Sequence, residues 1–186
     1  MQHRTTGSVR GIKSFAFTAW IACPNISDRV VLHRSASDWL EKRLMSREFH
    51  TRRRVEFRDT DAAGIAHFSA FFFWMESAEH EWLRHLGVPL VAFAADGSKM
   101  SWPRVSVSCE YKGPLRHEDL FDIYASMSEI GTSSVTYQFR FELDGLLVAC
   151  GRVVAVYCLL KQGQPLEAIA LPDTVRDLLQ SASSDS

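Results

Sequence analysis

The chain has 186 residues, of which 46% are hydrophobic and 23% charged, and its formal net charge is −1. This length suits one globular domain with a real core plus an extension, and the composition excludes a wholly disordered chain. The near-neutral charge gives no reason to expect nucleic-acid binding, and no apolar run approaches the ~20 residues that a membrane span needs. The four cysteines have no CxxC spacing, so we expect idle thiols in a reducing, cytoplasmic setting.

Residues 1–47 show no sustained hydrophobic period and differ from the rest of the chain. The apolar run at residues 15–23 follows basic residues, but Thr18 interrupts it and the cleavage pattern is weak, so it makes a poor signal peptide. We therefore expect an N-terminal extension that is poorly ordered or outside the core domain, with a targeting segment as the alternative. The extension could also be an artefact of start-codon choice, because Met45 lies just before the patterned region and could be the true start.

The patterned region begins with a strand, an acidic loop and a long helix. Residues 52–57 alternate in polarity like a half-buried strand, and the loop over residues 59–67 contains small residues and Gly64, which permits a positive φ. We expect the helix to begin at Ser69, its N-cap, and to end before Gly87. Its apolar side chains recur at spacings of three and four, so most of its surface should be covered.

The remainder of the patterned region is typical of antiparallel sheet. Alternating polarity and apolar runs predict four strands, which span residues 105–111, 121–128, 135–143 and 146–160. Asp144-Gly145 is a strong signal for a two-residue hairpin, and Gly151 is expected to mark a bulge. A short helix should follow Leu171, and residues 181–186 are expected to form a disordered tail.

These elements predict an α+β core domain over residues 48–180. One strand, one long helix and about four antiparallel strands can bury each other only if the sheet curls around the helix. We therefore expect a curled antiparallel sheet of about five strands wrapped around one central helix. The chain lacks βαβ alternation and phosphate-binding glycine motifs, which disfavours a Rossmann fold.

Asp61 is the sharpest candidate for chemistry. It lies in the loop directly before the start of the helix, where backbone N–H groups are unpaired and the helix dipole favours negative charge. Such an end can hold the oxyanion that develops on a carbonyl, and a carboxylate beside it can serve as nucleophile or general base. His67 could position a water or bind the carbonyl. The alternative is that Asp59, Asp61 and His67 are turn residues with local backbone bonds.

Other polar residues are weaker candidates. Glu76 and His80 are four residues apart on one helix face and could form a polar pair in a site, whereas Glu79 is expected at the surface. Lys112, Arg116 and Arg104 flank a Gly-Pro turn and could meet phosphates, or could be solvated surface charges. The spacing of aspartate and histidine in the loop does not match a zinc site, so we expect no metal. No GxSxG motif is present.

The stretch VEFRDTDAAGIAHFSAFFFWMESAEH closely resembles the acyl-CoA thioesterases of the hotdog fold, in the 4-hydroxybenzoyl-CoA thioesterase and YbgC-like class. The segments PRVSVSCEYKGPLRHEDLFDI, GTSSVTYQF, GLLVACGRVVAVYCLL and LPDTVRDLL continue the resemblance in order, so that it covers roughly residues 52–179. The resemblance implies a hotdog fold and hydrolysis of a thioester to a carboxylic acid and coenzyme A, with no cofactor beyond the substrate.

The resemblance also implies roles for particular residues. The catalytic aspartate falls on Asp61, and the backbone amide that polarises the thioester carbonyl falls on Phe68, with Gly64, Ser69 and Glu76 beside the substrate. The acyl group would run beside the central helix, and a second subunit would complete the site in a homodimer or homotetramer. The chain departs from the family pattern because His67 stands one position before the usual histidine.

The family's basic cluster for coenzyme A phosphates is also changed. At the corresponding turn, Ser134 is the only residue of a type that contacts the phosphates in the family. Phosphate binding would therefore need Lys112, Arg116, Arg152 or the partner subunit. Alternatively, an acyl carrier protein would carry the acyl group in place of coenzyme A.

Two other functions stay open. A hotdog dehydratase of 3-hydroxyacyl thioesters would require His67 and Glu76 to converge, and a non-catalytic module would bind acyl-CoA without turnover.

Overall fold

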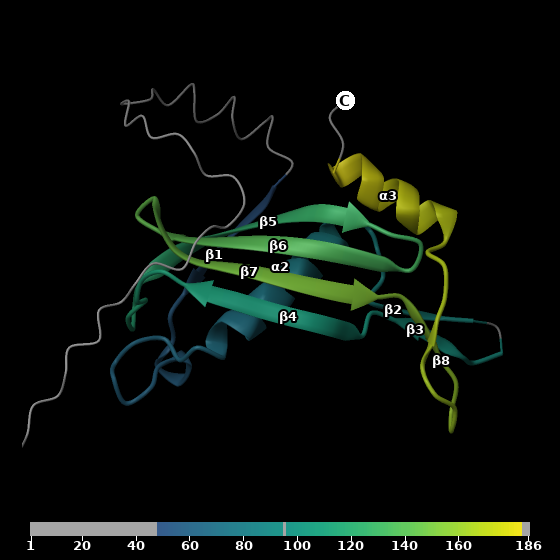
Figure 1. Ribbon diagram of the computed structural model, residues 1–186, viewed down its shortest axis with the longest axis horizontal. Helices are drawn as coiled ribbons and strands as arrows, with labels where there is room; N and C mark the ends of the chain where they lie inside the picture. Colours follow the sequence, from purple (N-terminus) through teal and green to yellow (C-terminus); the bar gives the residue numbers. More distant parts are fainter. Residues whose placement is uncertain (1–47, 95, 184–186) are drawn as a thin grey trace, which may run out of the picture. The chain divides into compact units, whose positions relative to one another are not determined.

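The computed structural model describes residues 48–94 and 96–183 (Figure 1). The predictions for residues 1–47 and for the last three residues of the tail lie outside the described residues. Residues 181–183 were expected in the disordered tail, but they form the last turn of a helix that ends at Ser183. Among the described residues, no helix is long and apolar enough to cross a membrane.

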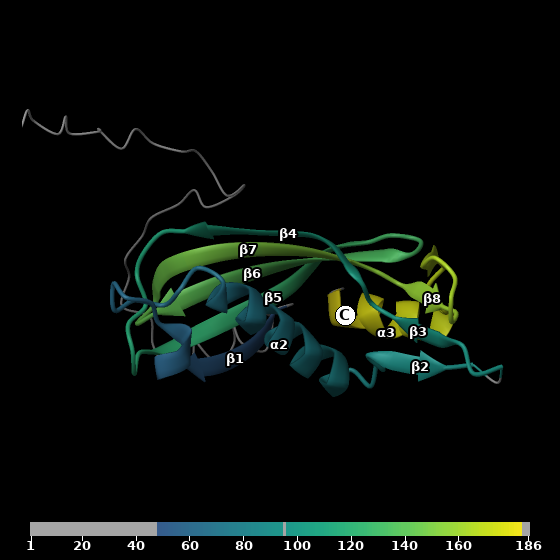
Figure 2. The ribbon, with the colours of Figure 1, turned by 90° about the horizontal axis from the view of Figure 1, so that it is seen from below.

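The described residues form a curled five-stranded sheet, a smaller second sheet and two α-helices. The elements are β1 (Phe49–Arg54), the short 3-10 helix η1 (Phe57–Asp59), α2 (Ala70–His85), β2 (Val91–Phe93), β3 (Lys99–Ser101), β4 (Arg104–Tyr111), β5 (Leu120–Ile130), β6 (Ser134–Leu143), β7 (Leu146–Val156), β8 (Cys158–Leu160), β9 (Glu167–Ala168) and α3 (Asp173–Ser183). The large sheet has the strand order β1-β5-β6-β7-β4 with antiparallel neighbours throughout. Figure 2 shows the sheet arching over α2, which confirms the predicted hotdog architecture.

The core lies between α2 and the inner face of the large sheet. The apolar side chains that the helix buries recur at the predicted spacings of three and four. The buried residues of the helix, with the unpredicted Glu79 among them, are Ala70, Phe71, Trp74, Met75, Ala78, Glu79, Trp82 and Leu83. The sheet contributes every second residue, for example Phe121, Ile123 and Ala125 on β5. Because alternate side chains of a strand point to opposite faces, the more polar residues of each alternating strand lie on the outer face.

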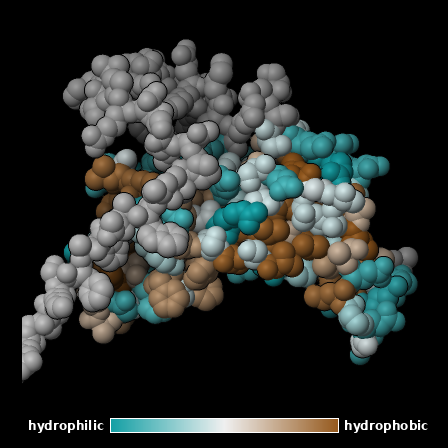
Figure 3. Space-filling view, in the orientation of Figure 1, coloured by the Kyte–Doolittle hydropathy of each residue, from teal (hydrophilic) through white to brown (hydrophobic). Residues whose placement is uncertain are grey.

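The outer face of the sheet carries charged side chains that pair across strands. Arg52 on β1 donates to Asp122 on β5 over 3.0 Å, and Arg140 on β6 donates over 2.7 Å to Glu48, which directly precedes β1. Figure 3 shows this face, where hydrophilic and hydrophobic residues are interspersed over the strands. The apolar face of the sheet is therefore the one that α2 covers.

Gly151 has a packing function rather than the predicted one. The register of β7 runs unbroken through Gly151 against both β4 and β6, so the predicted bulge is wrong. A Cβ atom at this position would lie 2.1 Å from Sδ of Met75, which is fully buried on α2. The missing side chain therefore lets the helix approach the middle of the sheet.

Among the turns and the shorter strands, some predictions from the sequence are confirmed and others are not. The hairpin at Asp144-Gly145 is confirmed, since both residues have a positive φ, as a type I′ turn requires. The first strand is displaced toward the N-terminus, because β1 ends at Arg54 and η1 follows. The small sheet β2-β3-β8-β9 was not predicted, because its strands have two or three residues and show no period.

Candidate active site

The loop between η1 and α2 folds back on itself and presents Asp61 at its tip. Thr60 and Ala66 form a bridge, and the N–H of Asp61 donates to the carbonyl of Ile65 over 3.0 Å. Within the tip, the N–H of Gly64 donates to the carbonyl of Asp61 over 3.0 Å, and Gly64 adopts a φ of +72°, as its flexibility allows. The tip of the loop is therefore held by its own backbone bonds, while Ala66 at its base packs in the core.

The Asp61 carboxylate is exposed and has a fixed anchor. Its Oδ1 accepts the N–H of Ala63 over 2.8 Å, and the other oxygen has no hydrogen bond to the described residues. The loop is also tied to the β4–β5 connection, since the N–H of Ala66 donates to the carbonyl of Leu115 over 2.7 Å. One carboxylate oxygen thus stays available for a ligand while the other holds the side chain in place.

Asp59 differs from Asp61 because its side chain is used within the turn. Its Oδ2 accepts the N–H of Glu56 over 2.9 Å, and its carbonyl accepts the N–H of His67 over 2.7 Å. Its side chain is mostly buried, with 16% exposed. These bonds engage both its side chain and its main chain in shaping the turn, so Asp59 is a structural residue.

The start of α2 offers an unpaired donor. Ser69 occupies the predicted N-cap position, but its side chain makes no capping bond to the helix. The N–H of Phe68 has no hydrogen-bond partner among the described residues, and its side chain is 58% exposed. Unpaired N–H groups at the positive end of a helix dipole bind carbonyl oxygens and oxyanions. The loop therefore brings an exposed carboxylate and an unpaired N–H to one end of the helix.

His67 binds within the same turn and not to Asp61. Its Nδ1 lies 2.7 Å from the hydroxyl of Ser69 and also accepts the Ser69 N–H at 3.4 Å. An Nδ1 that accepts an N–H carries no proton, so we assign the proton of the neutral ring to Nε2. The ring also packs on that of Phe68, with centroids 4.3 Å apart. In this arrangement His67 supports the turn that carries the Phe68 N–H.

A second polar cluster lies further along α2, and its centre is Glu79. Glu79 was expected at the surface, but its side chain is fully buried, so this prediction is wrong. Its Oε1 accepts a bond from Arg104 at the start of β4 over 3.0 Å. Its Oε2 and the hydroxyl of Tyr137 on β6 are both buried without a partner among the described residues. Burial raises the pKa of Glu79 to about 7, although Arg104 acts in the opposite direction.

Glu76 and His80 flank this cluster on the more exposed side of α2. The Nε2 of His80 lies 2.8 Å from the Arg104 guanidinium, which can only donate, so Nε2 must accept and His80 is neutral here. Burial, and then the charge of Arg104, lower the pKa of His80. Glu76 is half-exposed and lies 4.0 Å from His80 and 3.8 Å from Arg104. The predicted Glu76–His80 pair is thus organised by Arg104, for which the sequence analysis had left phosphate contact or a solvated surface position open.

The remaining candidates for substrate binding are divided between the two ends of the sheet. Arg116 forms a bridge with Ile65 of the Asp61 loop, and Lys112 directly follows β4 at the same end, where it pairs with Glu110 over 2.8 Å. Ser134 begins β6 opposite Val156, at the other end of the sheet. The strand rise of ~3.3 Å per residue separates that end from the Asp61 loop by roughly 20 Å, so one protomer does not bring Ser134 to Asp61.

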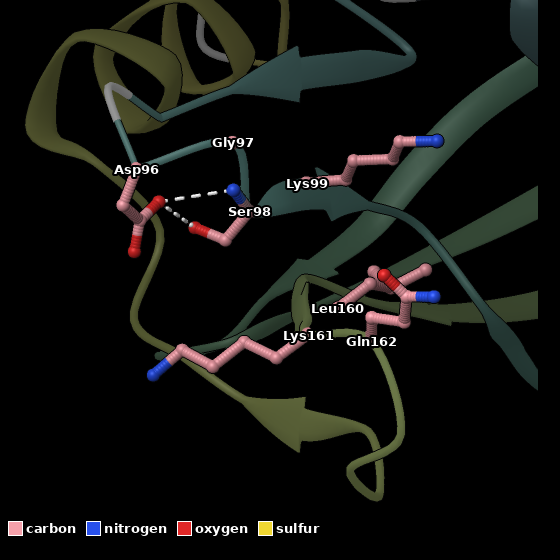
Figure 4. A pocket seen from close by; sticks show the side chains of 7 residues that line it. All are labelled: Asp96, Gly97, Ser98, Lys99, Leu160, Lys161 and Gln162. Atoms are coloured by element: carbon pink, nitrogen blue, oxygen red, sulfur yellow. Dashed lines mark hydrogen bonds between the residues drawn. The ribbon is translucent and has the colours of Figure 1, made fainter.

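The small sheet contains a pocket that does not belong to this site. It has a volume of about 620 Å³ and is lined by Asp96, Gly97, Ser98, Lys99, Leu160, Lys161 and Gln162. Figure 4 shows Asp96 turned toward Ser98, which donates to it through its N–H and its hydroxyl, while the lysines extend from separate elements. Figure 2 places β2, β3 and β8 beyond the C-terminal end of α2, away from the Asp61 loop. Among the described residues, no cluster of His, Cys, Asp and Glu could hold a metal ion.

The fold is a hotdog fold, in which a curled sheet wraps a helix that has an exposed carboxylate at its N-terminal end. The sequence matches the Thioesterase-like superfamily over residues 55–179. The chain belongs to this superfamily, which confirms the resemblance that the motifs indicated.

Curated relatives and solved structures agree with this assignment. A putative esterase of Aquifex aeolicus is 30% identical over 71% of this chain and 98% of its own. The 1,4-dihydroxy-2-naphthoyl-CoA hydrolase of Parasynechococcus marenigrum is 31% identical over 71% of this chain and 88% of its own. The structure of a gentisyl-coenzyme A thioesterase has a TM-score of 0.61 at 28% identity, covering 70% of this chain and 99% of its own. A 1,4-dihydroxy-2-naphthoyl-CoA thioesterase from Synechocystis has a TM-score of 0.64 at 19% identity, with 72% and 96% coverage, and shares the fold.

Proposed function

We propose that this chain hydrolyses an acyl-CoA thioester to a carboxylic acid and coenzyme A, and that the acyl group is a hydroxylated aromatic acid. Two of the similar proteins bear names for hydrolysis of such thioesters, one of a dihydroxynaphthoyl group and the other of a gentisyl group. The proposal rests most on one observation, which is that the exposed Asp61 carboxylate and the unpaired Phe68 N–H belong to the same short loop in front of α2.

In the proposed mechanism the thioester carbonyl lies at the start of α2. The Phe68 N–H donates to the carbonyl oxygen and stabilises the negative charge that develops there, helped by the helix dipole. Asp61 then acts in one of two ways. It attacks the carbonyl carbon and expels the coenzyme A thiolate, leaving an anhydride that water hydrolyses, or it removes a proton from the water that attacks. Both routes consume one water and release the acid and the thiol.

Replacement of Asp61 by Asn tests this mechanism, because an amide can serve neither as nucleophile nor as base. We expect kcat to fall by about 100-fold or more while binding of the product coenzyme A persists. Thiol release from a panel of aromatic and aliphatic acyl-CoAs is the measurement. Asp59→Asn is the matched comparison and should lower the melting temperature more than Asp61→Asn does. Unchanged turnover in Asp61→Asn would remove Asp61 from the mechanism.

The coenzyme A end of the substrate is assigned to Arg116 and Lys112. Arg116 is exposed, makes no ion pair within the described residues, and is joined to the Asp61 loop through the backbone of Ile65. An acyl carrier protein is the other carrier that this basic end could accept. Arg152 on the outer face of the sheet lies away from the loop and is the less suitable of the arginines that the sequence analysis named.

The proposal includes a homodimer. The strand β4 is an edge of the large sheet with no outer neighbour among the described residues, and it exposes Val105, Val107 and Tyr111. An exposed apolar edge strand invites pairing with another strand. A second subunit paired there would also offer its own Ser134 to the site. A monomer by light scattering at the assay concentration would contradict the shared site.

The dehydratase alternative receives no support from the geometry. It requires His67 and Glu76 to converge on one substrate carbon, but His67 bonds to Ser69 while Glu76 lies beside Arg104 and His80. Release of free thiol by the wild-type chain also distinguishes hydrolysis from the binding module, which would retain acyl-CoA without turnover.

A further inference from the structure

The first turn of α2 is tighter than an α-helix and leaves one carbonyl without a helical donor. The N–H of Ala70 donates to the carbonyl of His67 over 2.9 Å, and the N–H of Phe72 donates to the carbonyl of Ser69 over 3.1 Å. Both bonds span three residues, as in a 3-10 turn. In a regular α-helix Phe72 would instead donate to the carbonyl of Phe68. That carbonyl therefore needs a donor from elsewhere.

The donor comes from the edge strand β4. The hydroxyl of Tyr111, the last residue of β4, donates to the carbonyl of Phe68 over 3.0 Å, across 43 residues of sequence. The ring of Tyr111 meets the buried ring of Phe71 edge-on, with centroids 5.1 Å apart. Its main chain is in register with Ala149 of β7, so the ring has support from both the sheet and the helix.

Tyr111 keeps its proton throughout the range in which proteins are folded. Burial, and then the neighbouring Cys109, raise the pKa of Tyr111 to about 12. A neutral phenol has one O–H to donate, and here that donor is used on the Phe68 carbonyl. The phenol is consequently in its donating form near neutral pH.

We propose that Tyr111 is a positioning residue for the oxyanion-binding turn and acts through the Phe68 carbonyl. The Phe68 N–H and carbonyl lie in adjacent peptide planes that meet at Cα of Phe68, and the plane of the N–H is itself held by the bond from the Ala70 N–H to the His67 carbonyl. Anchoring the Phe68 carbonyl therefore limits the backbone rotation at Phe68 that would turn its N–H away from the substrate. Tyr111 touches neither the thioester nor Asp61 in this assignment. The inference rests on the proposed hydrolysis and adds to it the group that holds the Phe68 N–H in its catalytic direction.

Tyr111→Phe is the direct test, because it removes the hydroxyl and keeps the ring contact with Phe71. An oxyanion donor acts mainly in the transition state, so we expect kcat to fall by about five- to 20-fold with KM within about twofold of the wild type. Hydrogen exchange of the peptide over residues 64–74 should quicken, whereas the melting temperature should stay within a few degrees. Tyr124→Phe is the matched control, since Tyr124 is a half-buried strand tyrosine on the outer face of the same sheet.

The outcomes separate this inference from the proposed hydrolysis. If the wild type releases thiol, Asp61→Asn does not, and Tyr111→Phe equals the wild type in kcat, the positioning role is overturned and the hydrolysis stands. A drop in kcat that comes with a large loss of thermal stability, or a change in KM alone, also overturns it, because a general packing defect would give that result. If the wild type releases no thiol from any thioester, it is the proposed hydrolysis that fails.

Discussion

Arg104 donates to Glu79 over 3.0 Å, and this bond joins the first residue of the edge strand β4 to the middle of the central helix. The Glu79 carboxyl is fully buried, and its second oxygen lies unpartnered, as does the hydroxyl of Tyr137. A buried carboxylate with only part of its hydrogen bonds satisfied is costly to ionise, which explains the direction of its pKa shift.

Glu79 should therefore make the free energy of unfolding fall as the pH rises, whereas carboxylates in folded proteins usually have the opposite effect. Its pKa rises from 4.5 to about 7 on folding, so between these values the folded chain holds a proton that the unfolded chain has lost. Its contribution is greatest below about pH 4.5, falls as the pH rises, and levels off above about pH 7. The difference amounts to about 3 kcal/mol at most.

The comparison of wild type with Glu79→Gln measures this contribution. Urea unfolding at one protein concentration, from about pH 5 to about pH 8, should show the wild type losing about 2.5 kcal/mol relative to the variant. Glu110→Gln is the control, since it removes an exposed carboxylate that pairs with Lys112 and takes no part in the Glu79 cluster, and it should keep the wild-type slope. Parallel curves for the wild type and Glu79→Gln would show that the proton is not held by Glu79.

The contact between Gly151 and Met75 gives a prediction about packing. A Cβ at residue 151 would lie 2.1 Å from Met75 Sδ, so Gly151→Ala must displace a buried side chain. Overpacking of this kind costs about 1–3 kcal/mol of unfolding free energy. Gly113→Ala is the matched control, because its Cβ would meet Val148 at 3.6 Å, an ordinary contact, and should change stability by about 0.5 kcal/mol or less.

The double variant Gly151→Ala with Met75→Ala decides whether that contact is the cause. Met75→Ala alone removes buried atoms and should be destabilising, but the alanine at residue 151 would occupy part of the space that it leaves. In chemical denaturation, the loss of unfolding free energy in the double variant should be smaller than the sum of the losses in the two single variants. A strictly additive result would place the cost of Gly151→Ala somewhere other than Met75.

The sequence allowed prediction of the features that depend on neighbouring residues. The helix, the long strands and the Asp144-Gly145 turn follow from local periodicity and local backbone chemistry. The roles of Asp61 and Phe68 come from the family resemblance and stay predictions, although both residues lie in the one loop before the helix. The burial of Glu79 had a local signal that was not used, since it stands four residues after Met75 and three before Trp82, both on the apolar face.

The features that could not be predicted all depend on contacts between distant residues. Arg104 is 25 residues from Glu79, and Tyr111 is 43 from Phe68, so nothing in either local pattern points to its partner. The same holds for Gly151. A glycine within a strand suggests a bulge, but here the close approach of Met75 on the helix is what requires a residue without a side chain. The short strands of the small sheet exist only because they pair with one another.

Arg116 is the basic residue that we expect to distinguish coenzyme A from a shorter thioester. Its backbone bridge to Ile65 places it beside the Asp61 loop, and its guanidinium makes no ion pair with the described residues. An exposed ion pair with a phosphate contributes about 1 kcal/mol or less, so Arg116→Ala should raise KM for acyl-CoA about three- to fivefold. With the corresponding pantetheine thioester, which lacks the nucleotide phosphates, KM should not change. Added salt should weaken the effect, because it screens exposed charges. Arg152→Ala, on the outer face of the sheet, serves as the matched variant, and a rise in KM there but not in Arg116→Ala would move the phosphate site away from the loop.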